Sequence, residues 1–178
     1  MLFRSDLAMS LALEAVPICR NPRQPSAIWR HLLASAPPEN TSAGTGGETP
    51  EAKARQEKCR ELTRICLEQL DGADKGIASM AGWDCVNSAT VVLYSKQVER
   101  FLPHCQEMLA GTLRRATELG MGTTMARATH LGVYAKAMQR CHASAEDMAG
   151  FRQAVQSAFP GDPDIERLTA SLEAKTNP

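Results

Sequence analysis

Apolar residues recur at alternating steps of three and four in two stretches of the chain that lie forty residues apart. The first stretch contains Val91, Tyr94, Val98, Phe101, Cys105 and Met108, and the second contains Leu131, Tyr134, Met138, Cys141, Ala145 and Met148. This spacing places the apolar side chains along one side of an α-helix. The same separation of forty residues lies between the only two tyrosines of the chain, and it is within the range of lengths of helical-repeat units. The pattern therefore predicts two imperfect repeats near 89–120 and 124–160, with both tyrosines on the apolar side.

Signals for helix starts and stops predict the remaining elements. Thr49-Pro50-Glu51 combines a capping hydroxyl, a proline at the first helical position and an acid in the first turn. Ser144 and Asp147 have the spacing of a capping box. Together with Pro103, which interrupts helical hydrogen bonding, these signals predict helices at 5–16, 27–35, 50–70, 89–102, 104–119, 124–141, 144–158 and from 163 onwards, with a helix or a turn at 73–88.

The composition agrees with a helical protein. Of the 178 residues 43% are hydrophobic, which is enough for a core, but only 4% are aromatic, and helix-forming Ala, Leu, Met, Glu, Gln, Lys and Arg dominate. We therefore predict an all-α fold, either a helical bundle or a short array of helical hairpins with an N-terminal helical arm. Lys and Arg equal Asp and Glu at twenty each, so no net charge attracts the chain to nucleic acid, and we expect no nucleic-acid partner.

Three parts are expected along the chain. Residues 1–36 would form an N-terminal docking arm, 37–49 a polar, Gly-rich flexible linker, and 50–178 the α-helical body. The two arm helices are too short to be stable alone, so they must pack either on the body or on another chain. If the arm helices pack on another chain, removing residues 1–36 would leave a folded body. The arm residues expected to bind a partner are Ile28, Trp29, Leu32 and Leu33.

The six cysteines are interpreted as reduced thiols in a core. Cys59 and Cys66 are seven residues apart on one predicted helix, which places their Cα atoms roughly 10 Å apart, whereas a disulfide needs less than about 7 Å. The pairs His104-Cys105 and Cys141-His142 suggest a zinc site, but adjacent side chains on a helix diverge by about 100°. We therefore expect neither a metal nor a cofactor.

The sequence lacks the motifs of known catalytic sites. Gly120-Met121-Gly122 has no third glycine and no preceding strand, so it does not predict a phosphate loop. The softest apolar stretch, 76–94, is interrupted by polar residues, and we expect no transmembrane span. Reduced thiols favour an intracellular, reducing compartment, and Arg20, Arg23 and Arg30 near an apolar N-terminus leave import into mitochondria open.

These observations favour a non-catalytic accessory or scaffold subunit of a larger multiprotein assembly, with a mitochondrial complex as the preferred hypothesis. Its partners would be other protein subunits. Two alternatives remain open at the level of sequence. One is an RNA-binding helical-repeat module, suggested by Arg114, Arg115, Arg127, Lys136 and Arg140. The other is a bacterial chaperone-like regulatory protein that captures a segment of a client.

Overall fold

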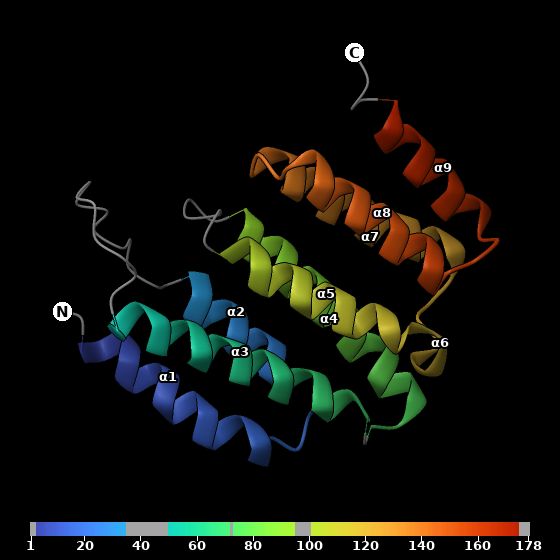
Figure 1. Cartoon of the computed structure of the whole chain (residues 1–178). Coiled ribbons are helices and arrows are strands. Elements are labelled where there is room, and N and C mark those ends of the chain that lie inside the picture. The colour runs from blue at the N-terminus through green and yellow to red at the C-terminus, as the bar shows by residue number, and fades with distance from the viewer. Residues whose placement is uncertain (1–2, 35–49, 72, 95–100, 175–178) are drawn as a thin grey trace, which may run out of the picture.

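The computed structural model describes residues 3–34, 50–71, 73–94 and 101–174 (Figure 1). These residues form α-helices and one short 3-10 helix, with no strand, which confirms the predicted all-α fold. The elements are α1 (Phe3–Ala15), η1 (Val16–Ile18), α2 (Gln24–Ala34), α3 (Pro50–Asp71), α4 (Lys75–Leu93), α5 (Leu102–Arg114), α6 (Ala116–Leu119), α7 (Thr124–Arg140), α8 (Ala145–Ala158) and α9 (Pro163–Glu173). The predicted linker 37–49 lies outside the described residues.

Capping residues set the starts of the C-terminal helices. The Ser144 hydroxyl accepts a hydrogen bond from the backbone N–H of Asp147, and the Asp147 carboxylate accepts one in return, so the predicted capping box is confirmed. At α9 the carboxylate of Asp162 accepts hydrogen bonds from the backbone N–H groups of Asp164 and Ile165. These bonds satisfy donors that the first helical turn would otherwise leave unpaired.

The helices pack in two layers. Layer 1 consists of α1, α3, α5 and α8, and layer 2 consists of α2, α4, α7 and α9; apart from the short α6, the chain alternates between the layers. In Figure 1, α3, α5 and α8 lie in front of α2, α4 and α7. The described chain thus runs as successive pairs of antiparallel helices, stacked from α1 at one end to α9 at the other.

Neighbouring helices of layer 1 run in the same direction. Lys58 on α3 donates a hydrogen bond to the Ser10 hydroxyl on α1 at 3.1 Å, and Gln69, further along α3, donates to the carbonyl of Val16 at 2.7 Å. Later residues of one helix therefore lie beside later residues of its neighbour. This is the arrangement of stacked helical hairpins, in which each helix pair buries its apolar side against the next pair.

Layer 2 has the same parallel order. Arg127 on α7 pairs with Asp162 at the start of α9 at 3.3 Å, and Gly132, about a turn and a half later, packs against Leu168 of α9. The guanidinium of Arg127 also lies 4.7 Å from the centroid of the Phe159 ring. Because the Asp162 side chain is buried, this ion pair and the cap together fix α9 on α7.

The N-terminal helices belong to the same packed body in this structure. Helix α2 packs on both α3 and α4, and α1 packs on α3. Trp29 and Leu33 are 0% and 1% exposed and are part of the same core cluster as Leu62 and Val86. The two short N-terminal helices therefore pack on the body of the chain itself.

The small-residue stretch that the sequence left as a helix or a turn forms the central helix, α4. It contacts α2, α3, α5, α6 and α7, and eleven of its sixteen residues between Ala78 and Leu93 are buried. A Cβ added at Gly82 would lie only 3.1 Å from a methyl carbon of Leu119. Small side chains are therefore required here because several helices approach the backbone closely.

One sequence prediction is wrong. Tyr134 is fully buried in the middle of α7. Tyr94, in contrast, follows the last residue of α4 and is 42% exposed, and Val91 of the same predicted stripe is 45% exposed. The two tyrosines are thus not in equivalent environments, and Tyr94 is not a core residue. Residues 95–100, which belong to the predicted first copy, lie outside the described part of the chain, so the duplication stays a prediction.

Candidate protein-binding surface

Exposed apolar side chains are concentrated on two adjacent helices of layer 2. Among the described residues nine large apolar side chains are exposed, and six of them lie on α4, on its C-cap or on α7. We name the surface formed by the solvent-facing sides of these two helices the outer face. It comprises Ile77, Met80, Asp84, Asn87, Val91 and Tyr94 from the α4 segment and Met125, Thr129, Val133, Lys136 and Arg140 from α7.

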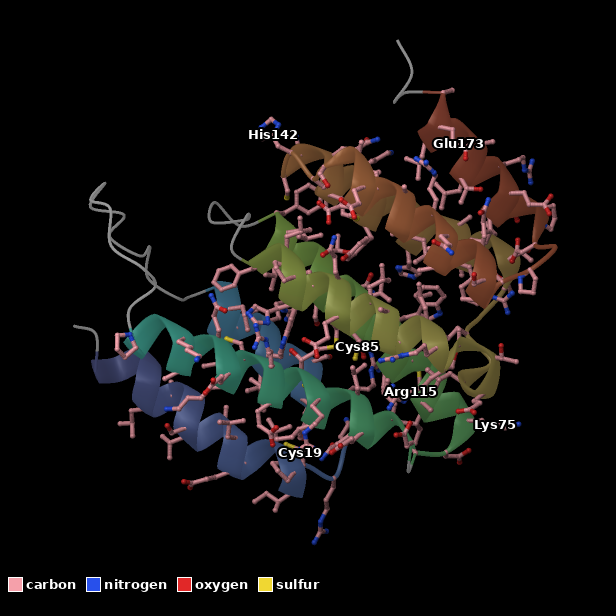
Figure 2. All side chains as sticks on the ribbon, in the orientation of Figure 1. Cys19, Lys75, Cys85, Arg115, His142 and Glu173 are labelled. Atoms are coloured by element: carbon pink, nitrogen blue, oxygen red, sulfur yellow. The ribbon has the colours of Figure 1, made fainter. Side chains whose placement is uncertain are left out.

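The spacing of residues on α4 explains why large apolar side chains point to solvent. The positions from Ile77 to Tyr94 on the outer face follow steps of three and four, which is one stripe of a helix. The opposite sides of α4 carry small residues such as Ala78, Ala81 and Cys85, which allow close packing against the surrounding helices. In Figure 2 the label for Cys85 marks this interior, whereas Lys75 extends from the end of the helix.

Polar contacts connect the outer face to its neighbours. The guanidinium of Arg23, just before α2, forms two hydrogen bonds with the carboxylate of Asp84 on α4. On the other side of α4, the side-chain oxygen of Asn87 lies 2.9 Å from Nδ1 of His130 on α7. These contacts hold α4 between α2 and α7, so the outer face is a fixed surface rather than a set of independent helices.

An aromatic contact forms the floor between α4 and α7. The rings of Trp83 and His130 stack with centroids 4.8 Å apart and an interplanar angle of 25°. At the end of the same boundary, the Arg140 guanidinium lies 5.4 Å from the centroid of the Tyr94 ring. The arginine thereby restricts the exposed tyrosine, which lowers the conformational entropy that a partner would have to remove on binding.

A polar pocket borders the outer face between α2 and α4. Its volume is about 330 Å³, and it is lined by Asn21, Arg23, Gln24, Ser26, Ala27, Arg30, Asp84, Asn87 and Ser88. Two of these residues, Asp84 and Asn87, also belong to the outer face. A segment bound along α4 would therefore pass over the pocket.

A second pocket lies in layer 1. It has a volume of about 250 Å³ between α5 and α8, with Met138 of α7 also in its lining. The remaining lining residues are Gln106, Leu109, Ala110, Glu146, Asp147, Gly150, Phe151 and Ala154. Gln106 donates a hydrogen bond to Asp147 at 2.7 Å within this lining. The pocket is mainly apolar and is separate from the outer face.

The structure does not expose the predicted partner-binding residues together. Trp29 and Leu33 are buried, while Ile28 and Leu32 are half-buried and pack against the core. All four side chains therefore make intramolecular contacts, and binding a partner through Trp29 would first require α2 to leave α3 and α4. That these four residues bind a partner stays a prediction. In this arrangement α2 lies beside α4 in layer 2 and supports it from one side.

Buried thiols offer little reactivity at neutral pH. Burial raises the pKa of Cys66, Cys85 and Cys105, to about 12 in the case of Cys85. These thiols are therefore protonated, whereas nucleophilic attack and metal binding need the thiolate. Cys141 donates a hydrogen bond to the backbone carbonyl of Leu93 at 2.9 Å, which joins α7 to α4. Within the described residues, no group of three or more His, Cys, Asp and Glu side chains is placed to hold a metal ion.

Tyr134 is a buried polar residue that the sequence assigned only to packing. Its ring stacks on Phe151 with centroids 5.6 Å apart, which joins α7 to α8. Burial raises the pKa of its hydroxyl well above the ordinary value, with the buried Cys105 and Cys141 nearby. Its hydroxyl oxygen has no hydrogen-bond partner in the described structure, so the contribution of Tyr134 comes from ring packing.

No described helix combines the length and hydropathy that crossing a bilayer requires. Comparison with known proteins gives no match to a family model, to a curated protein or to a solved structure.

Proposed function

We propose that this protein is a non-catalytic accessory or scaffold subunit of a larger multiprotein assembly, and that it binds a partner protein through the outer face of α4 and α7. The observation that carries the proposal is the concentration of exposed apolar side chains there. Ile77, Met80, Val91, Met125 and Val133 are each between 41% and 74% exposed. Exposed apolar side chains that cluster on adjacent elements are typical of protein interfaces, where tyrosine and methionine are also enriched.

The two-layer packing supports this role mechanically. Helix α4 is enclosed by α2, α3, α5, α6 and α7, so its exposed stripe cannot rearrange without disrupting the core. The bridges from Arg23 to Asp84 and from Asn87 to His130 add polar restraints on each side. A partner would therefore meet a surface that is already ordered, which reduces the entropic cost of binding.

The proposal changes the role of the N-terminal helices without changing the class of function. With Trp29 in the core, α2 is a structural support for α4, and the partner contacts are made by α4 and α7. The compartment, including the preferred mitochondrial location, is proposed on the N-terminal sequence alone.

The test compares two aspartate substitutions in the full-length protein. Val91→Asp places a charge on the outer face, and Leu11→Asp places the same charge on an exposed apolar position of α1, in layer 1. Both positions lie in the C-terminal half of their helix.

Affinity purification of tagged variants from the source cells, followed by quantitative mass spectrometry, gives the result. We expect a stoichiometric partner with the wild type and with Leu11→Asp, and loss of that partner with Val91→Asp, while circular dichroism shows that both variants are folded. Retention of every stoichiometric partner by Val91→Asp would overturn the proposed surface. Loss only with Leu11→Asp would assign binding to α1 instead.

A further inference from the structure

The polar pocket between α2 and α4 is rich in hydrogen-bond donors. Among its lining residues, two arginines and three side-chain amides surround a single carboxylate, that of Asp84. Arg23 already neutralises Asp84 through paired hydrogen bonds. The pocket therefore has one positive charge in excess, which is supplied by Arg30.

Arg30 distinguishes this pocket from a surface network in which every charged side chain has a partner of opposite charge. It is half-buried on α2, and it makes no ion pair with any described residue. A guanidinium that lines a concave site and lacks an anionic partner can bind a carboxylate with two parallel hydrogen bonds. The side-chain oxygen of Asn87 is occupied by His130, so the amide group of Asn87 can supply a further donor to the same site.

The pocket interrupts the apolar stripe of α4 at its middle. Along the outer face, Ile77 and Met80 come first, Asp84 and Asn87 follow at the pocket, and Val91 and Tyr94 come last. Met80 and Val91 are therefore about 16 Å apart along the helix axis, at a rise of about 1.5 Å per residue. An extended segment covers that span with about five residues.

We propose that the outer face binds a protein segment in which an Asp or Glu side chain enters the pocket beside Arg30 while apolar side chains on each side of it contact Met80 and Val91. This inference rests on the proposed function and specifies the chemistry of the partner. The pocket supplies charge complementarity, and the two ends of the stripe supply apolar contact. The combination selects a segment in which an acidic residue lies between apolar residues.

A protein segment fits this surface better than RNA does. Single-stranded nucleic acid binds to a continuous positive groove with aromatic platforms for the bases. Here the apolar side chains of Met80, Val91 and Val133 interrupt the cations, and the guanidinium of Arg140 already lies near the exposed Tyr94 ring. Aliphatic side chains at both ends of a single charged pocket match an amphipathic peptide instead.

Selection from a phage-displayed library of short random peptides tests the proposal on the full-length protein. The targets are the wild type, Arg30→Gln, and the control Arg114→Gln, which makes the same change at an exposed position in layer 1. We expect the wild type and Arg114→Gln to enrich peptides with Asp or Glu between apolar residues. Arg30→Gln is expected to lose the preference for acid while still enriching apolar peptides.

Fluorescence anisotropy with the most enriched synthetic peptide then measures the contribution of the pocket. We expect Arg30→Gln to weaken binding by about fivefold to tenfold, as for a partly exposed charge-assisted contact, and Arg114→Gln to leave it unchanged. Changing the acidic residue of the peptide to its amide should weaken binding to the wild type by a similar factor and should have little further effect on Arg30→Gln. This double-mutant cycle assigns the coupling to that pair of residues.

Three results would overturn the inference. One is the enrichment, on the wild type, of apolar peptides without acidic residues. If Val91→Asp abolishes the binding of those peptides, the proposed function still holds and only the inference about the acidic residue fails. Another is the absence of any enriched peptide on the wild type. The third is binding of a random-sequence single-stranded RNA at low salt that Arg30→Gln removes, because the pocket would then bind phosphate.

Discussion

The indole N–H of Trp29 donates a hydrogen bond to the hydroxyl oxygen of Thr63 at 2.9 Å, inside the core and across 34 positions of sequence. Thr63 in turn donates to the backbone carbonyl of Cys59 at 2.9 Å, so the polar atoms of this pair are satisfied within the chain. The contact joins α2 to α3 over residues 35–49, which lie outside the described structure. Trp29 therefore holds α2 against α3 within the core.

Replacing Trp29 should strongly destabilise the protein. Trp29→Ala removes a fully buried side chain and its hydrogen bond, and we expect a loss of about 3–5 kcal/mol in the free energy of unfolding. Trp29→Phe keeps most of the packing but loses the donor, so its cost should be smaller, about 1–3 kcal/mol. Urea titration followed by circular dichroism measures both, with the exposed neighbour His31→Ala as the control. A change below about 0.5 kcal/mol for Trp29→Ala would contradict the packing of α2.

Deleting residues 1–36 provides a broader test of the same packing. If these residues were only a docking arm, the remaining body would stay folded and would unfold cooperatively. The structure instead predicts a destabilised body, because the deletion uncovers the sides of α3 and α4 against which α1 and α2 pack. Thermal unfolding monitored by circular dichroism should show a broader transition at lower temperature than in the full chain. A truncated protein with an unchanged midpoint would favour an independent arm.

Two glycine-to-alanine substitutions should have opposite effects. A Cβ at Gly111 on α5 would collide with the Leu67 side chain on α3, so Gly111→Ala should cost about 1–3 kcal/mol of stability as the helices shift. Gly150 lies in the interior of α8 with nothing within 4 Å of an added Cβ, and Gly150→Ala should stabilise by about 0.5–1 kcal/mol. Chemical denaturation of both variants gives the comparison, and equal signs would show that the spacing of α3 and α5 is not as described.

The buried His104 predicts a specific pH dependence of stability. Burial, together with the nearby positive charge of Arg60, lowers the pKa of His104 from its ordinary value of 6.5 to about 4. Between these two values the unfolded chain binds a proton that the folded chain does not bind. Stability should therefore fall as the pH decreases from about 6.5 to about 4, by at most about 3 kcal/mol.

The variant His104→Gln should remove that dependence. Free energies of unfolding measured at several pH values between 4 and 7 should fall for the wild type and stay much flatter for His104→Gln. The lowered pKa of Asp147, caused first by its hydrogen bond with Ser144, affects stability only below its ordinary value of 3.8 and does not overlap with this window. Equal slopes for the two proteins would show that His104 is not buried in its neutral form.

Much of the helical architecture could be predicted from local chemistry. Pro50, the Ser144 capping box and Asp162-Pro163 locate three helix starts because caps and prolines act within one turn and need no tertiary context. The stripe of Ile165, Leu168 and Leu172 on α9 likewise packs inward as expected. The helices α8 and α9 lie at one end of the stack, where one side of each helix faces the core and the other faces solvent.

The outer face could not be predicted, because α4 carries apolar residues on its buried and on its exposed sides. Val86 and Leu93 are buried, whereas Val91 and Tyr94 face solvent. The apolar pattern that contained Val91 and Tyr94 therefore pointed to the wrong side. The steps from Ile77 through Met80 to Val91 were visible as a stripe, but only the positions of α2 and α7 show that this stripe is uncovered.

The most direct measurement of the central claim is site-specific photo-crosslinking within the native assembly. A photoreactive amino acid replaces Val91 on the outer face in one protein and Arg114, exposed in layer 1, in another. We predict a covalent adduct with the same stoichiometric partner from position 91 and none from position 114. Crosslinking to that partner from position 114, with none from position 91, would contradict the assignment of the outer face.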